Sequence, residues 1–205
     1  QQYPQISALV VGLPGMEQNG KLVVVDYPVL QDVAFAGRLQ QELACPVYVE
    51  NDINAAVLGY SSTLGSRALQ ETIVGIYLPQ NYSPGAGISL AGKIYKGRDG
   101  MAGEIGNRLQ FKYSGAGLSA MQSIVRRMAE LVVLFTATWN PHRLVFYQET
   151  VTQKQLSDIQ QLAAEHFAVA FLPKLELRPS IYEDYGRGIC QLAMKYLNSN
   201  RNEEF

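Results

Sequence analysis

The sequence contains few of the residues that metal sites and covalent catalysis require. Its 205 residues include two cysteines and two histidines: Cys45, Cys190, His142 and His166. The cysteines show no CxxC spacing and sit in apolar sequence, which predicts buried free thiols of a reducing compartment. The histidines belong to no motif, and lone histidines are mostly structural or surface residues. We therefore expect no bound metal, no cofactor and no triad of a nucleophile with a histidine base.

The sequence also lacks a strong net charge and a long hydrophobic run. Its formal net charge is −1 and its longest basic run is the pair Arg126-Arg127, which is not the footprint of a DNA-binding surface. The most apolar stretch, residues 128–137, is interrupted by Glu130 and is too short to cross a bilayer. With 47% hydrophobic and 17% charged residues, the composition is that of a globular protein, and no signal peptide opens the chain. These features predict a cytoplasmic protein that contacts neither membrane nor DNA directly.

Strand-like apolar runs alternate with helix-like segments along the whole chain. We expect strands at residues 6–11, 21–25, 47–49, 72–78, 85–90, 93–95, 144–147 and 175–177. We expect helices at residues 32–43, 53–62, 119–138, 153–167 and 181–197. This alternation predicts an α/β fold with mixed sheets flanked by helices. We place a boundary between two lobes near residues 64–70, so that residues 1–66 are the remainder of an N-terminal lobe and residues 67–205 are a C-terminal lobe.

The stretch PVYVENDIN, residues 46–54, has the clearest functional pattern. A short strand ends in polar residues and passes directly into a small-residue helix, so the polar groups lie at the carboxyl end of a sheet, where ligands of open α/β sheets bind. Two interpretations are open. Asn51 or Asp52 caps the helix by accepting a backbone N–H, or these side chains face a ligand.

A glycine-spaced loop, residues 97–107, carries Glu104 and Asn107. These two are either solvated turn residues or binding groups. Carboxylates and amides at strand ends suit sugar hydroxyls, each of which donates and accepts a hydrogen bond. No GxxxxGK[ST] phosphate loop occurs, and the run Gly85-Ala86-Gly87 is too short for a dinucleotide fingerprint.

Four motifs, in order and spacing, resemble the ROK family of bacterial sugar kinases and sugar-responsive transcriptional repressors. They are GLPG at 12–15, PVYVENDINAA at 46–56, GAGISLAGKIYKG at 85–97 and GMAGEIGN at 100–107. The resemblance implies an actin-like (ribonuclease H-like) ATPase fold, present in part. It also implies a monosaccharide pocket, because in the family's kinases the aspartate matching Asp52 is the base that deprotonates a sugar hydroxyl, and the residues matching Asn51 and Glu104 bind hydroxyls. We count Asn107, Gly85 and Gly87 among the expected substrate-binding residues.

The chain departs from the family pattern at the nucleotide motifs. The first phosphate motif, an Asp-Gly-Gly-Thr-like turn, is expected upstream of residue 1. The second, a Gly-Thr-Gly turn, is replaced at 79–84 by a segment with two prolines and the bulky Tyr82. Each proline lacks the backbone N–H that could approach a phosphate, and the Tyr82 side chain works against that approach by its size. The adenosine-side glycine run corresponds to 145–149, which has no glycine. Phosphoryl transfer depends on positioning and stabilising the phosphates, so we do not expect kinase activity.

Two further departures concern the sugar side. Asn107 stands where the family usually has a histidine, and the family's cysteine-rich zinc loop is replaced by residues 108–117, which contain no cysteine. A second sugar-binding glutamate corresponds to Ser119 or Ala120. The identity of the sugar therefore stays open.

We predict a sugar- or sugar-phosphate-sensing effector domain of a ROK-type transcriptional regulator, without kinase activity. Its DNA-binding domain would lie upstream, and the chain would form a homodimer through the helix at 119–138 or its neighbours. One alternative is a divergent ATP-dependent hexose kinase with Asp52 as base. A second is an interaction domain whose former pocket is filled by side chains such as Tyr82.

Overall fold

The computed structural model describes residues 6–23, 27–78, 84–106, 120–149 and 151–202. The strands are β1 (Leu9–Leu13), β2 (Met16–Gln18), β3 (Lys21–Val23), β4 (Val47–Asn51), β5 (Thr72–Tyr77), β6 (Gly85–Leu90), β7 (Lys93–Ile94), β8 (Arg143–Tyr147) and β9 (Lys174–Arg178). The helices are α1 (Phe35–Leu43), α2 (Asp52–Thr63), α3 (Ala120–Trp139), α4 (Gln153–Ala163) and α5 (Ile181–Asn202). The alternation of strands and helices confirms the predicted α/β class.

The largest sheet is mixed and has the strand order β7-β6-β5-β8-β9. Strands β5, β8 and β9 are parallel, whereas β6 and β7 are antiparallel to their neighbours. A separate parallel pair joins β1 to β4, and β2 forms a hairpin with β3. Because β1 is parallel to β4 with Leu13 opposite Asn51, the GLPG turn lies beside the end of β4.

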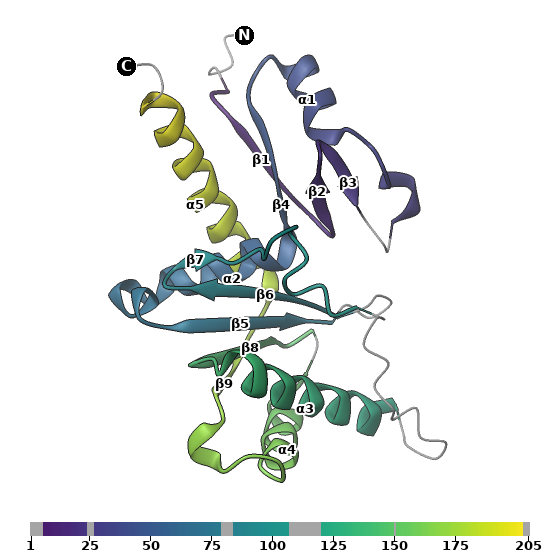
Figure 1. The fold of residues 1–205 in the computed structure, drawn as a ribbon, viewed down its shortest axis with the longest axis vertical. Helices are drawn as coiled ribbons and strands as arrows, with labels where there is room; N and C mark the ends of the chain where they lie inside the picture. Colours follow the sequence, from purple (N-terminus) through teal and green to yellow (C-terminus); the bar gives the residue numbers. More distant parts are fainter. Residues whose placement is uncertain (1–5, 24–26, 79–83, 107–119, 150, 203–205) are drawn as a thin grey trace.

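Helices cover both faces of the five-stranded sheet (Figure 1). Along β8, Leu144 and Phe146 pack into the cluster that contains α3 and α4, whereas Val145 and Tyr147 pack into the cluster that contains α2. This alternation follows from the two-residue period of a strand. The largest sheet is therefore buried on both faces, as its continuous apolar runs predict.

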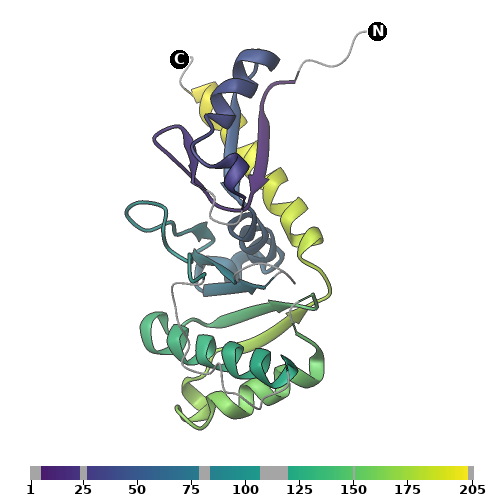
Figure 2. The same cartoon turned by 90° about the vertical axis from the view of Figure 1, so that its right-hand side faces the viewer.

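Helix α5 connects the five-stranded sheet to the β1–β4 pair (Figure 2). It crosses α2 at two glycines, because a Cβ on Gly59 would lie 1.8 Å from the Asp184 carbonyl oxygen and a Cβ on Gly188 would lie 1.8 Å from that of Ala55. Between these two crossing points, the Tyr185 hydroxyl bonds both backbone groups of Gly12. The same helix thus packs on α2 and on β1, and the division of the chain at residues 66 and 67 stays a prediction.

Several element boundaries differ from the sequence predictions. Strand β1 spans Leu9–Leu13 instead of residues 6–11, and α5 extends to Asn202 instead of residue 197. The first helix begins at Phe35 instead of residue 32, because Asp32 has a φ of +61° and its amide donates to Leu22 O of β3. Strand β2 was not predicted; it pairs with β3 across the turn Asn19-Gly20, where both residues have positive φ. The fourth predicted helix ends at Ala163, four residues early.

One of the two cysteine predictions is wrong. Cys45 is a buried free thiol, but Cys190 is exposed. On α5 the buried Leu192 and the half-buried Ile189 lie three residues apart and share one face, so Cys190 falls outside that stripe despite its apolar sequence neighbours. Among the described helices, none has both the length and the apolarity that a membrane crossing needs.

Candidate functional site

The passage from β4 to α2 is built around Asn51, the last residue of the strand and the N-cap of the helix. Its Oδ1 accepts a hydrogen bond from the Asn54 amide at 3.1 Å, and its Nδ2 donates to Gly15 O at 2.9 Å. The capping interpretation is therefore confirmed for Asn51. The second bond ties this strand end to the GLPG turn, so the same side chain fixes two motifs.

Asp52 is the first residue of α2, and its carboxylate is half-buried at the end of β4. Its Oδ1 accepts a hydrogen bond from the Ile53 amide at 2.7 Å. Burial raises the pKa of the carboxyl above its ordinary value, and backbone hydrogen bonds to the carboxylate offset this effect only in part. The group is thus a carboxylate that gains from an additional hydrogen-bond donor or from taking up a proton.

The loop that carries Glu104 rests directly on the start of β6. The Ala86 amide donates to Gly103 O at 2.9 Å, and the Gly106 amide donates to Pro84 O at 3.0 Å. A Cβ on Gly103 would lie 1.8 Å from Ala86 O, and this residue has a φ of +92°, so only glycine fits here. Glu104 is half-buried beside these contacts.

The first turn of α2 packs on the same end of β6. A Cβ on Gly87 would lie 2.8 Å from Ile53 O, and one on Gly85 would lie 3.6 Å from Ile53 Cγ2. Asp52 and Glu104, which are far apart in the sequence, are therefore both placed around the start of β6. The two glycines permit this close packing, and their contact with a ligand stays a prediction. Asn107 and Tyr82 lie outside the described residues.

The histidines do not contribute to this region. His142 Nδ1 accepts a hydrogen bond from the Thr72 amide at 3.0 Å. This contact lies at the amino ends of β8 and β5, whereas the candidate site lies at the carboxyl end of β4. This contact confirms a structural role for His142, while His166 is exposed after α4. No group of three or more His, Cys, Asp or Glu side chains within the described ranges is placed to hold a metal ion.

The carboxyl end of β8 is closed by Tyr147. Its side chain is fully buried and meets the Tyr77 ring edge-on, with ring centroids 6.2 Å apart. Both rings pack with Ile53 and Ile181 in one apolar cluster. Burial raises the pKa of Tyr147, and its hydroxyl has no hydrogen-bond partner within the described part of the chain. This strand end is therefore a packed aromatic contact.

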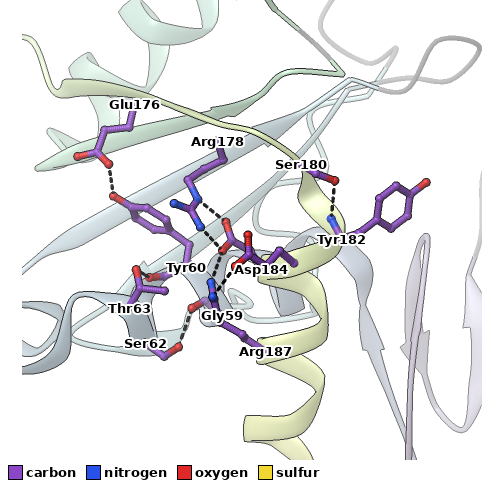
Figure 3. A network of polar contacts seen from close by, with 11 residues as sticks. Gly59, Tyr60, Ser62, Thr63, Glu176, Arg178, Ser180, Tyr182, Asp184 and Arg187 are labelled. Carbon is purple, nitrogen blue, oxygen red and sulfur yellow. Dashed lines mark hydrogen bonds and ion pairs between the residues drawn. The ribbon is translucent and has the colours of Figure 1, made fainter.

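A polar network lies beside it and joins β9 to α2 and α5 (Figure 3). Arg178 donates two hydrogen bonds to Asp184, each 2.9 Å long, and Asp184 is fully buried. The Arg178 guanidinium lies 5.6 Å from the centre of the Tyr60 ring, and the Tyr60 hydroxyl donates to Glu176 at 2.6 Å. These contacts fix the beginning of α5. Sequence reasoning missed them because no short motif marks partners that are brought together by three separate elements.

Known proteins resemble this chain in sequence and in fold. The sequence model of the ROK family matches residues 1–113. A xylose repressor from Caldicellulosiruptor bescii is 31% identical over 104 residues, which are 50% of this chain and 25% of that protein. An N-acetyl-D-glucosamine kinase from Vibrio cholerae is 34% identical over 101 residues, which are 47% of this chain and 32% of the kinase.

Solved structures are similar over a longer part of the chain. The ROK hexokinase from Thermus thermophilus superimposes with a TM-score of 0.70 and 17% identity, covering 94% of this chain and 80% of the hexokinase chain. The protein thus has the fold of the ROK sugar kinases, as the resemblance implies. It matches only about a quarter to a third of the length of the two curated relatives.

Proposed function

The chain belongs to the ROK family, and from this premise we propose that it is the effector-binding part of a sugar-responsive transcriptional regulator. It binds a monosaccharide or sugar phosphate through Asn51, Asp52 and Glu104, with Asn107, Gly85 and Gly87 as further expected binding residues, and does not phosphorylate it. It acts in the cytoplasm as a homodimer, and its contact with DNA is made by an upstream domain.

The observation that carries this proposal is the difference between two neighbouring strand ends. At the end of β4, Asn51 and Asp52 are polar residues whose side chains are half-buried. At the end of β8, where the family's kinases have an adenosine-side glycine run, Tyr147 fills the space between Tyr77 and the start of α5. This arrangement favours a retained sugar side and a nucleotide side that has become core.

The proposed site binds by matching hydrogen-bond donors with acceptors. A sugar hydroxyl donates to the Asp52 carboxylate, and a second hydroxyl donates to Glu104. Leaving one buried partner unmatched costs about 1–3 kcal/mol, so the pattern of hydroxyls decides which sugar is accepted. The ligand then regulates the protein by binding one arrangement of the elements around β4 and β6 more tightly than another, and its effect cannot exceed that difference in affinity.

Isothermal titration calorimetry tests the proposal. The names of the relatives suggest D-xylose and N-acetyl-D-glucosamine, and the panel includes D-glucose and the phosphates of all three. We expect one of them to bind wild-type protein and to lose at least about tenfold in affinity in Asp52→Ala and Glu104→Ala. Asp99→Ala, an exposed carboxylate of the same loop, is the matched control and leaves affinity unchanged. Binding that is equal in all four proteins, or absent from the whole panel, contradicts the proposal.

The alternative is a hexose kinase in which Asp52 is the base. The raised pKa of Asp52 favours this alternative, because a general base works best when its pKa approaches the working pH. The measurement is ATP turnover in the presence of the sugar that binds. Turnover that disappears in Asp52→Asn establishes the kinase, whereas sugar binding without ATP binding establishes the sensor.

A further inference from the structure

An ion pair joins the strand end that carries Asn51 and Asp52 to the loop that carries Glu104. Glu50 Oε2 lies 2.8 Å from Lys96 Nζ. The Glu50 side chain is 4% exposed and the Lys96 side chain 48% exposed, so the carboxylate is buried while the cation still reaches water. Removing the cation would leave a buried charge without this compensation, which is far more costly than losing a surface pair.

The other oxygen of Glu50 holds the backbone next to Asp52. Glu50 Oε1 accepts hydrogen bonds from the Asn51 amide at 3.0 Å and from Asn54 Nδ2 at 3.3 Å. Asn54 is in turn the residue whose amide is bonded by the Asn51 side chain. The carboxylate of Glu50 is therefore part of the structure that orients the first turn of α2.

Lys96 lies at the base of the loop that carries Glu104. Its carbonyl oxygen accepts a hydrogen bond from the Ala102 amide at 3.1 Å, which closes residues 97–101 into a turn. Just before it, the Tyr95 amide donates to Ile88 O of β6 at 2.8 Å. The loop is thus fixed to β6 at both ends, and its base is fixed to β4 through the Lys96 side chain.

We propose that Glu50 and Lys96 are positioning residues that set the distance between Asp52 and Glu104. The pair contacts neither the ligand nor the hydroxyls; it acts by holding the two segments that do. This inference rests on the proposed function for its effect on affinity, but the positioning itself is a property of the free protein. The two parts are therefore tested separately.

Hydrogen exchange of the unliganded protein tests the positioning. In Lys96→Met we expect the amides of Ala102, Glu104 and Gly106 to exchange at least about tenfold faster, together with those of Ile53 and Asn54, because both segments lose their common anchor. In Lys96→Arg, which keeps the cation, we expect the same amides to exchange as slowly as in wild-type protein. Lys93→Met, an exposed lysine in the same hairpin, is the control. The inference is overturned if Lys96→Met and Lys93→Met exchange alike, or if all amides of the protein accelerate equally.

Sugar affinity tests the consequence, with whichever of D-xylose, N-acetyl-D-glucosamine and D-glucose binds wild-type protein. We expect Lys96→Met to weaken binding about tenfold and Lys96→Arg to retain it. The double variant Glu50→Gln/Lys96→Met is expected to bind no more weakly than the weaker of its two single variants, Glu50→Gln and Lys96→Met, since both residues act through one contact. Additive losses in the double variant overturn the inference. If no sugar binds wild-type protein while the exchange result holds, the proposed function fails and the positioning role stands.

Discussion

The carboxyl ends of β4 and β8 meet in one apolar cluster but have opposite chemistry. Ile53, next to Asp52, packs in the same cluster as Tyr147. On the β4 side, Asn51 and Asp52 use their side chains for hydrogen bonds to backbone. On the β8 side, the Tyr147 ring is buried so completely that its hydroxyl has no partner within the described residues. The side chains of Asn51 and Asp52 at the end of β4 thus have hydrogen-bond partners. The Tyr147 hydroxyl at the end of β8 is buried without one in the described part of the chain.

The two strand ends differ in what their buried polar groups cost and in what offsets that cost. A buried hydroxyl without a partner costs about 1–3 kcal/mol, so Tyr147 is retained for the area that its ring buries. A half-buried carboxylate with a raised pKa is also costly, and the backbone hydrogen bonds to Asp52 offset that cost only in part. The comparison therefore supports a stabilising role for the β8 end and agrees with the ligand recognition that we propose for the β4 end. Four sets of substitutions test it.

Tyr147→Ala is expected to have the largest effect. Removing a fully buried aromatic side chain leaves a cavity and lowers the free energy of unfolding by about 3–5 kcal/mol. Tyr147→Phe keeps the ring and removes the unpartnered hydroxyl, so it is neutral or stabilising by up to about 1 kcal/mol. Urea denaturation measures both. If Tyr147→Phe is as damaging as Tyr147→Ala, the hydroxyl has a role that packing does not explain.

Asp184→Asn tests the network beside β8. Asp184 is fully buried and bonded twice by Arg178, so losing its charge costs about 3 kcal/mol of unfolding free energy. Glu183→Gln, at the adjacent exposed position with an ion pair to Arg187, costs at most about 0.5 kcal/mol. Sugar affinity is expected to stay unchanged in both variants at temperatures where they are folded. A change in affinity of either would link the two strand ends.

Asn51→Ala and Thr152→Ala compare two helix caps. Each residue accepts a hydrogen bond at the N-terminus of its helix, Asn51 for α2 and Thr152 for α4, and each substitution lowers the unfolding free energy by about 1 kcal/mol. Calorimetric titration distinguishes them, because only Asn51→Ala is expected to weaken sugar binding. If Asn51→Ala binds the sugar as tightly as Thr152→Ala does, Asn51 caps the helix and does not bind the ligand.

Asp52→Asn is expected to have the smallest effect on stability. Unlike Tyr147→Ala, Asp184→Asn and Asn51→Ala, it is expected to raise the free energy of unfolding. Burial raises the pKa of Asp52 in the folded protein, so the folded state holds this proton more tightly than the unfolded chain. The free energy of unfolding of wild type therefore falls as the pH rises from the unfolded pKa through the folded one. Asp52→Asn removes that fall and is more stable than wild type at neutral pH. Unfolding by urea across the acidic to neutral range measures it; a loss of stability at neutral pH contradicts it.

Much of the fold was predictable because its signals are local. The direct passage from β4 to α2, the hairpin of β6 and β7 across Ala91-Gly92, and the α/β alternation each follow from apolar periodicity and turn residues, and the structure confirms them. The exposure of Cys190 was not predictable from its apolar neighbours, because it depends on which stripe of α5 faces α2. The start of α1 was missed because Asp32 bonds β3, a partner outside its own segment.

The sequence by itself determined which groups are present: an amide and a carboxylate at one strand end, an aromatic run without glycine at another, and the motifs that place the chain in the ROK family. Only the tertiary structure decided how they meet. Glycines at 85, 87 and 103 allow α2 and the Glu104 loop to approach one strand, β6, and Glu50 pairs with Lys96 across 46 residues of chain. The chemistry of a side chain is fixed by the identity of its own residue. The distance between two segments depends instead on how the whole fold packs, and therefore on many residues at once.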